Sequence, residues 1–177
     1  MPELAQDDRG RPATDRLNYT AFRLARALNR AAENTALAHG ISLPQLLILQ
    51  VLGEGRALSN AQVARRTFVS SQAAHVVSDE LLASGLIERS EHPTNRRVRL
   101  VSLTETGWSV LESCRVEIEE REVRLAAELG EPRGTLSEIL DRAAEVLAGG
   151  YFGDAHAEAA AVALRKRPSR GRTISPA

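Results

Sequence analysis

Two adjacent arginines, Arg96 and Arg97, stand at the tip of a predicted turn in the stretch SEHPTNRRVRLVSLTETG, residues 90–107. A proline precedes them, and the run that follows alternates apolar and polar side chains, as a half-buried β-strand does. Guanidinium groups bind DNA phosphates and are drawn into the narrow, negative minor groove of A·T-rich duplexes. The pair is therefore a candidate DNA contact, and the alternative is an ordinary solvated turn.

A second group of polar side chains precedes that turn. Ser70 or Ser71 can cap a helix that ends at Gly85. Helical spacing predicts an apolar stripe of Ala73, Val77 and Leu81. It leaves a polar face of Ser71, Gln72, His75, Ser78 and Asp79. Gln72 could bind adenine through two hydrogen bonds, while Ser70 and Ser71 at the helix N-terminus suit phosphate. In a generic helix these would simply be solvated residues.

Arg65 and Arg66 end the helix before this one. They could bind backbone phosphates, but arginines near a helix C-terminus also stabilise the helix dipole without any partner. Both interpretations stay open.

The predicted elements around these residues form a mainly α chain with a small two- or three-stranded β wing. Helices are predicted over 17–40, 42–53, 59–69, 70–85, 104–130 and 131–150, and strands over 86–90 and 97–104. Two short helices joined by a tight connection are a helix-turn-helix, and a hairpin directly after them is a wing.

The chain then divides into regions by composition and pattern. Residues 1–14 are predicted to be a disordered leader, and 41–103 a winged helix-turn-helix DNA-binding domain. Residues 15–40 and 104–150 form a helical dimerisation region, because their apolar stripes exceed what a small winged-helix core can cover. A partly disordered C-terminal extension with a basic tail is expected over 151–177.

Composition narrows the function classes. The 23 basic and 23 acidic residues cancel, so a nucleic-acid argument must rest on where the charges lie.

Cys114 is the single cysteine; its place on an apolar stripe predicts a buried thiol. The histidines at 39, 75, 92 and 156 lack metal spacing, so neither a metal nor a cofactor is expected. No nucleophile and base are suitably spaced for catalysis, so an enzyme is not expected. No apolar run is long enough to span a membrane, so a cytoplasmic protein is expected.

Three stretches resemble the MarR (multiple antibiotic resistance regulator) family of winged-helix transcription factors: ALSNAQVARR (57–66), DELLASGLIERS (79–90) and HPTNRRVRLVSLTETG (92–107). The last is similar to the family's wing, D-P-x-D-R-R followed by a strand and L-T-x-x-G. His92 and Asn95 stand where the family often has aspartates, and Val76 stands where it often has arginine.

The resemblance implies a homodimeric, sequence-specific regulator of transcription. It would repress from a pseudopalindromic operator in double-stranded DNA and be released by a small aromatic or amphipathic ligand between the dimer helices and the winged helix. Candidate ligand-binding residues are Tyr19, Phe22, Arg23 and Trp108. These rings could instead merely fill the joint between helices. The alternative function is a winged-helix protein-interaction module without ligand control, which the wing arginines disfavour.

Overall fold

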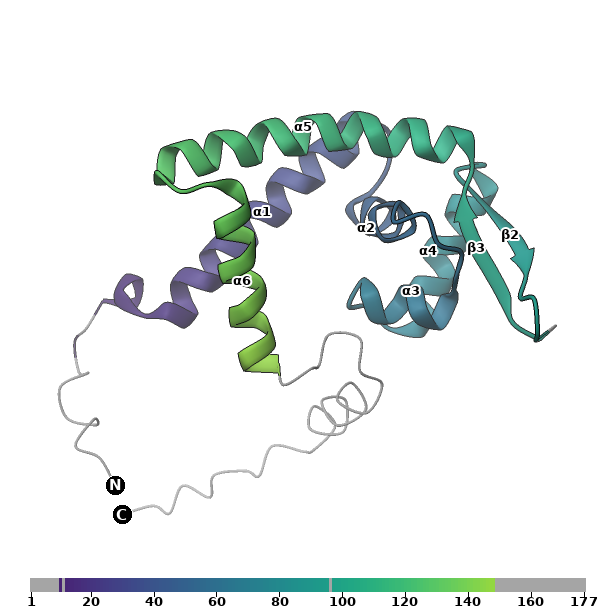
Figure 1. Ribbon diagram of the computed structural model, residues 1–177, viewed down its shortest axis with the longest axis horizontal. Coiled ribbons are helices and arrows are strands. Elements are labelled where there is room, and N and C mark those ends of the chain that lie inside the picture. Colours follow the sequence, from purple (N-terminus) through teal and green to yellow (C-terminus); the bar gives the residue numbers. More distant parts are fainter. Residues whose placement is uncertain (1–9, 11, 96, 149–177) are drawn as a thin grey trace, which may run out of the picture.

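The longest helix, α5 (Glu105–Leu129), connects a small winged unit at its first residues to helices α1 and α6 farther along (Figure 1). The computed structural model describes residues 10, 12–95 and 97–148. The remaining elements are η1 (Ala13–Asp15), α1 (Leu17–Ala38), α2 (Leu43–Leu52), β1 (Leu58–Ser59), α3 (Asn60–Arg66), α4 (Ser71–Ala83), β2 (Ile87–Glu91), β3 (Arg99–Leu103) and α6 (Arg133–Ala148).

The predictions for the two ends of the chain fall mostly outside the described residues. The extension at 151–177 lies entirely outside them, as do residues 1–9 and 11 of the leader. At the boundary of the predicted leader, Ala13–Asp15 forms a short 3-10 helix, η1, directly before α1.

Hydroxyl side chains begin four of the helices, as their sequence positions predict. Each accepts a hydrogen bond from a backbone N–H that would otherwise lack a partner in the first turn. The caps are Ser42 for α2, Ser59 for α3, Ser70 for α4 and Thr104 for α5. The first two form complete capping boxes with Gln45 and Gln62. These local bonds explain why the helix starts could be predicted.

The wing is a three-stranded antiparallel sheet in the order β1-β3-β2. Strands β2 and β3 form the predicted hairpin, with Ile87 opposite Leu103 and Glu91 opposite Arg99. The two-residue strand β1 adds to the other edge of β3 and pairs Leu58 with Val101. Its two residues are too few to produce an alternating pattern.

Helix α2 occupies the centre of the hydrophobic core. Its buried residues are Leu46, Ile48, Leu49 and Leu52. Helices α1, α4 and α5 and strand β3 all contact α2. From α5, Leu111 and Cys114 complete the core. A helix contacted on so many sides must be apolar nearly all round, which is why its sequence is so hydrophobic.

The prediction of a buried thiol at Cys114 is confirmed. Burial, and secondarily the nearby carboxylate of Glu117, raises the pKa of this thiol. Because the thiolate is the reactive form, both effects suppress its nucleophilicity. Among the described residues, no group of three or more His, Cys, Asp or Glu could hold a metal ion.

The first turn of α5 lies directly on the backbone at the start of β2. A Cβ atom on Gly107 would come within 2.0 Å of the Leu86 carbonyl oxygen. The Thr104 hydroxyl accepts the Gly107 N–H at 3.0 Å and donates to the Gly85 carbonyl at 2.7 Å. Glycine is therefore required at position 107 for close approach rather than for a special backbone conformation.

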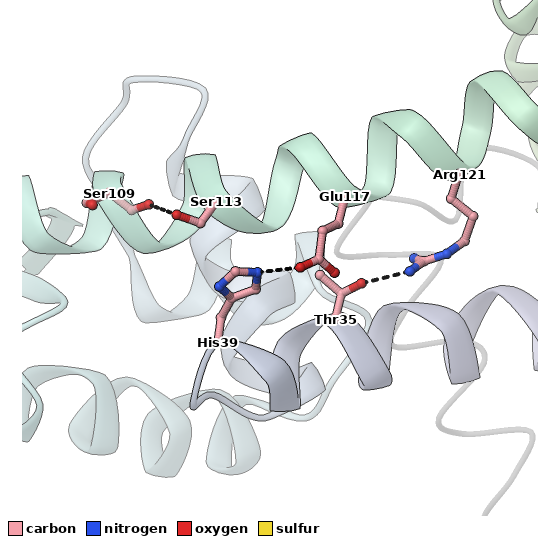
Figure 2. Close-up of polar contacts among 6 residues, drawn as sticks. All are labelled: Thr35, His39, Ser109, Ser113, Glu117 and Arg121. Atoms are coloured by element: carbon pink, nitrogen blue, oxygen red, sulfur yellow. Dashed lines mark hydrogen bonds and ion pairs between the residues drawn. The ribbon is translucent and has the colours of Figure 1, made fainter.

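A polar junction holds the end of α1 against the middle of α5 (Figure 2). His39 Nε2 lies 2.9 Å from Glu117 Oε1, and Arg121 donates to the hydroxyl of the buried Thr35 at 3.0 Å. The hydrogen bond with His39, followed by smaller effects that include the Arg121 charge, holds the pKa of Glu117 below its usual value. These bonds set where the two long helices cross.

The apolar stripes predicted on the long helices stay largely uncovered within one chain. On α1 only Thr35 and Ala36 are buried. Exposed large apolar residues lie on α1, on the second half of α5 and on α6, among them Leu17, Phe22, Leu28, Val123, Leu129, Leu140 and Val146. Patches of this kind usually mark interaction surfaces. No single helix in the described part of the chain is long and apolar enough to cross a membrane, although α1 and α2, bent by 89°, pass that test as a pair.

We predict that Gly107→Ala lowers the free energy of unfolding by about 1–3 kcal/mol, because the new methyl group must displace the Leu86 carbonyl. Chemical denaturation followed by circular dichroism measures this. Gly134→Ala is the control: nothing lies within 4 Å of a Cβ there, so stability should stay the same or rise slightly. Equal stability of the two variants would contradict the close contact.

We also predict that His39→Ala raises the pKa of Glu117, which a ¹³C NMR titration of the side chain would measure. With its folded-state pKa depressed, Glu117 contributes stability above its unfolded pKa, and this contribution is lost as pH falls through the folded value. The variant should therefore lose less stability than the wild type over that acidic interval. Ser113→Ala is the control, because the Ser113 hydroxyl donates to the Ser109 carbonyl on the same helix (Figure 2). An unchanged Glu117 pKa in His39→Ala would refute this role of His39.

Candidate nucleic-acid interface

Helix α4 packs on the core through Ala74, Ser78 and Leu81. The predicted stripe of Ala73, Val77 and Leu81 was therefore partly wrong: Ala73 is exposed and Val77 half-buried. Ser78, predicted to contact DNA, is 0% exposed and cannot reach a groove. Both sets have helical spacing, and a serine in the buried set concealed the correct one.

The turn that leads into α4 contains a backbone outlier. Phe68 has φ 59°, in the left-handed region, and its side chain is 64% exposed. The preceding Thr67 is buried, and its hydroxyl donates to the Val63 carbonyl at 2.9 Å. A bulky residue in this conformation costs about 1–2 kcal/mol, so the surrounding contacts must hold the turn in shape.

Most of the predicted polar face of α4 is exposed. It comprises Ser71, Gln72, His75 and Asp79. The Ser70 hydroxyl is used locally, since it accepts the Ala73 N–H at 3.1 Å. The helix carries Asp79 and Glu80 but no lysine or arginine. Attraction to phosphate must therefore come from residues outside α4.

A chain of polar contacts links α4 to both neighbouring elements. Asn60 of α3 lies 2.7 Å from His75 Nδ1, and Arg89 of β2 donates to Asp79 Oδ1 at 2.6 Å. His75 and Asp79 are 3.6 Å apart at their nearest charged atoms. Arg89 thus neutralises the acidic residue closest to it while joining the helix to the wing. Sequence patterns gave no sign of the Asn60–His75 and Arg89–Asp79 contacts, because these partners lie on different elements.

The predicted phosphate-binding arginines occupy different surroundings. Arg65 and Arg66 are half-buried at the end of α3, and Arg66 forms an ion pair with Glu54. Arg97 is exposed at the wing tip. The structure does not describe Arg96, so its predicted role falls outside the described residues.

His92 and Asn95 shape the wing turn at positions where aspartates are usual in the resembling family. Asn95 Oδ1 accepts the Arg97 N–H at 3.1 Å, and His92 Nδ1 accepts the Thr94 N–H at 3.3 Å. An Asn side chain can accept such a turn bond as an aspartate does. The substitution therefore preserves the local hydrogen bond and removes a negative charge beside Arg97.

The predicted ligand residues do not meet within one chain. Tyr19, Phe22 and Arg23 line a shallow hollow of about 520 Å³ along α1. Pairing of the α1 end with the middle of α5 places α1 antiparallel to α5 at the junction. At 1.5 Å per helical residue, Tyr19 lies about 24 Å from the junction, toward the C-terminal end of α5. Trp108 lies about 14 Å from the junction in the opposite direction, toward the N-terminal end of α5.

A different cleft, of about 450 Å³, opens between the end of α2, α5 and α6. Its lining residues include Glu54, Leu111, Arg115, Ile118, Glu119 and Arg133. Arg133 forms ion pairs with Glu119 at 2.8 Å and with Glu122 at 3.5 Å. Arg115 forms a longer ion pair, of 3.7 Å, with Glu112. The lining of the cleft is thus largely polar and charged, with Ile118 as a partly exposed apolar residue, and Glu54 connects the cleft to Arg66 of α3.

A helix-turn-helix, a three-stranded wing and long flanking helices define a winged helix-turn-helix protein. The model of the MarR family matches residues 39–98, from the end of α1 to the wing. An uncharacterised protein of Mycobacterium tuberculosis is 36% identical over 98 residues, which cover 55% of this chain and 68% of the relative. The chain belongs to the MarR family.

Other comparisons agree with this assignment. An HTH-type transcriptional repressor of Mycobacterium tuberculosis is 25% identical over 117 residues, covering 66% of this chain and 84% of the relative. CouR from Rhodococcus jostii RHA1, bound to p-coumaroyl-CoA, has the same fold with a TM-score of 0.68 at 18% identity, over 77% of this chain and 94% of CouR. CouR, a transcriptional repressor, is also known bound to a 23-mer DNA duplex. The chain therefore has the fold of MarR-family transcriptional regulators.

Proposed function

We propose that this chain is a homodimeric DNA-binding repressor that a small aromatic or amphipathic ligand releases from its operator. The observation that carries the proposal is the ion pair between Asp79 and Arg89, which joins the exposed face of α4 to the arginine-tipped wing as one surface. A recognition helix in the major groove with a wing beside it is the usual docking geometry of such surfaces. The DNA-bound form of CouR adds support.

The competing function is a winged-helix module that binds proteins. A protein-docking wing should expose apolar or aromatic side chains. Here the exposed side chains of the wing strands are largely charged, and include Glu88, Arg89, Glu91 and Arg99. No large apolar side chain is exposed on the described residues of the wing, which disfavours a protein-docking wing. These four charges cancel, so attraction to DNA is assigned to Arg97 at the tip.

Dimerisation accounts for the uncovered apolar faces of α1, α5 and α6. In this proposal residues 15–40 and 104–150 form the dimer, while 41–103 bind DNA. A symmetric dimer carries two recognition helices, so its half-sites should lie about one helical turn, or 34–36 Å, apart in a pseudopalindrome.

The cleft between α2, α5 and α6 is the proposed ligand site. The half-buried Ile118 offers an apolar contact for a ring, and Arg115, whose ion pair with Glu112 is long, offers a guanidinium to a carboxylate. CouR with bound p-coumaroyl-CoA supports an aromatic acid or its thioester as the ligand class. A tenfold loss of operator affinity requires a difference of only about 1.4 kcal/mol between the two states.

We predict that Arg97→Ala lowers affinity for the operator about tenfold. It should also flatten the salt dependence by about two units of slope, because the dimer loses one phosphate-binding arginine from each protomer. Gel shifts at several salt concentrations, with DNA from upstream of its own gene and the neighbouring genes, measure both. Arg124→Ala removes the same charge far from the wing and is the control. Sedimentation should show that both variants remain dimers.

Two results would contradict this part of the proposal. If Arg97→Ala and the wild type bind equally at every salt concentration, the wing does not contact DNA. A stable wild-type monomer at micromolar concentration would exclude the dimer.

For the ligand, we predict that aromatic carboxylates change the fluorescence of Trp108, the single tryptophan, and weaken operator binding in parallel. Trp108 lies one helical turn before Leu111, which borders the cleft, so a bound ring should alter its surroundings. Arg115→Ala should blunt both signals, whereas Tyr19→Ala, in the separate hollow on α1, should leave them unchanged. The reverse pattern would place the ligand on α1, and no response to a broad panel would exclude ligand control.

A further inference from the structure

Three side chains of α4 point most directly away from the protein: Gln72, Val76 and Ala83, of which Ala83 is the last residue of the helix. The buried stripe of Ala74, Ser78 and Leu81 defines the inward direction. At 3.6 residues per turn, Gln72 and Val76 lie about 160° around the helix from that stripe. Val76 is 53% exposed. The outward face of a recognition helix is the face that enters the groove.

The other exposed polar side chains beyond the first turn of α4 already have partners. His75 contacts Asn60, Asp79 is paired with Arg89, and Glu80 accepts from Gln45 at 3.1 Å. Gln72 and Val76 therefore remain to meet base edges. Gln72 presents an amide and Val76 presents two methyl groups, at outward positions where a basic recognition helix would place an arginine or lysine that binds guanine.

We propose that Val76 is a specificity-determining residue that contacts the C5-methyl group of a thymine, beside the base pair bound by Gln72. The thymine methyl is the one apolar group that the four bases present in the major groove, so only thymine gives Val76 a matching surface. Cytosine at the same position presents no methyl, and a purine presents polar atoms. This inference rests on the proposed DNA-binding function.

Replacing thymine by deoxyuridine tests the contact, since it removes only the C5-methyl. The wild-type dimer and full-length variants are titrated against operators carrying one symmetric pair of substitutions at a time. We expect one pair to weaken wild-type binding by about fourfold per half-site, the effect of removing one buried methyl. Val76→Ala should bind the normal operator more weakly and show little further weakening at that same pair.

Gln72→Ala is the matched control: it should bind more weakly overall and keep its sensitivity to deoxyuridine. Val76→Arg provides a second test, because it should shift the preference at that position from thymine toward guanine in selection from a random library. Circular dichroism checks that all variants fold. If deoxyuridine has no effect at any position, or equal effects in the wild type and Val76→Ala, the thymine contact is refuted while DNA binding stands. Absence of binding to any DNA would refute both.

Discussion

The close contact between the first turn of α5 and the Leu86 carbonyl is the constraint on which the arrangement depends. Gly107 permits the approach, and the Thr104 hydroxyl binds both sides of it. The direction in which α5 leaves the winged unit is thereby set by backbone contact, which cannot adjust as side chains do. Since α1 is attached to the middle of α5 and α6 follows its end, the placement of both inherits this geometry (Figure 1).

Charge is divided unequally across the candidate interface. Helix α4 carries two carboxylates and no cation, while arginines lie at the end of α3, along β2 and at the wing tip. One of the carboxylates, on Asp79, is neutralised by Arg89, so the helix can approach a polyanion without an unpaired acid at that point. In the proposed function, the elements that would supply long-range attraction are therefore distinct from α4, which would present its side chains to the bases, so positioning and base reading would be separate.

Local signals allowed most of the fold to be predicted from sequence. Helix starts at Ser42, Ser70 and Thr104 depend on bonds within three residues, and the hairpin depends on alternation, so both are visible in a short window. What failed was non-local. The buried face of α4 depends on which elements pack beneath it, and the separation of Trp108 from Tyr19 depends on how α1 crosses α5. Neither relation is encoded in the spacing of residues along one helix.

The shared position of Glu54 has a consequence for energetic linkage. It lines the cleft and is the ion-pair partner of Arg66 on α3. Any occupant of the cleft that changes this pairing changes the free energy with which Arg66 engages another anion. By reciprocity, an anion that takes Arg66 changes the affinity of the cleft for its occupant by the same factor. The concentration of occupant needed to fill the cleft would then differ between the chain with an anion bound at Arg66 and the chain alone.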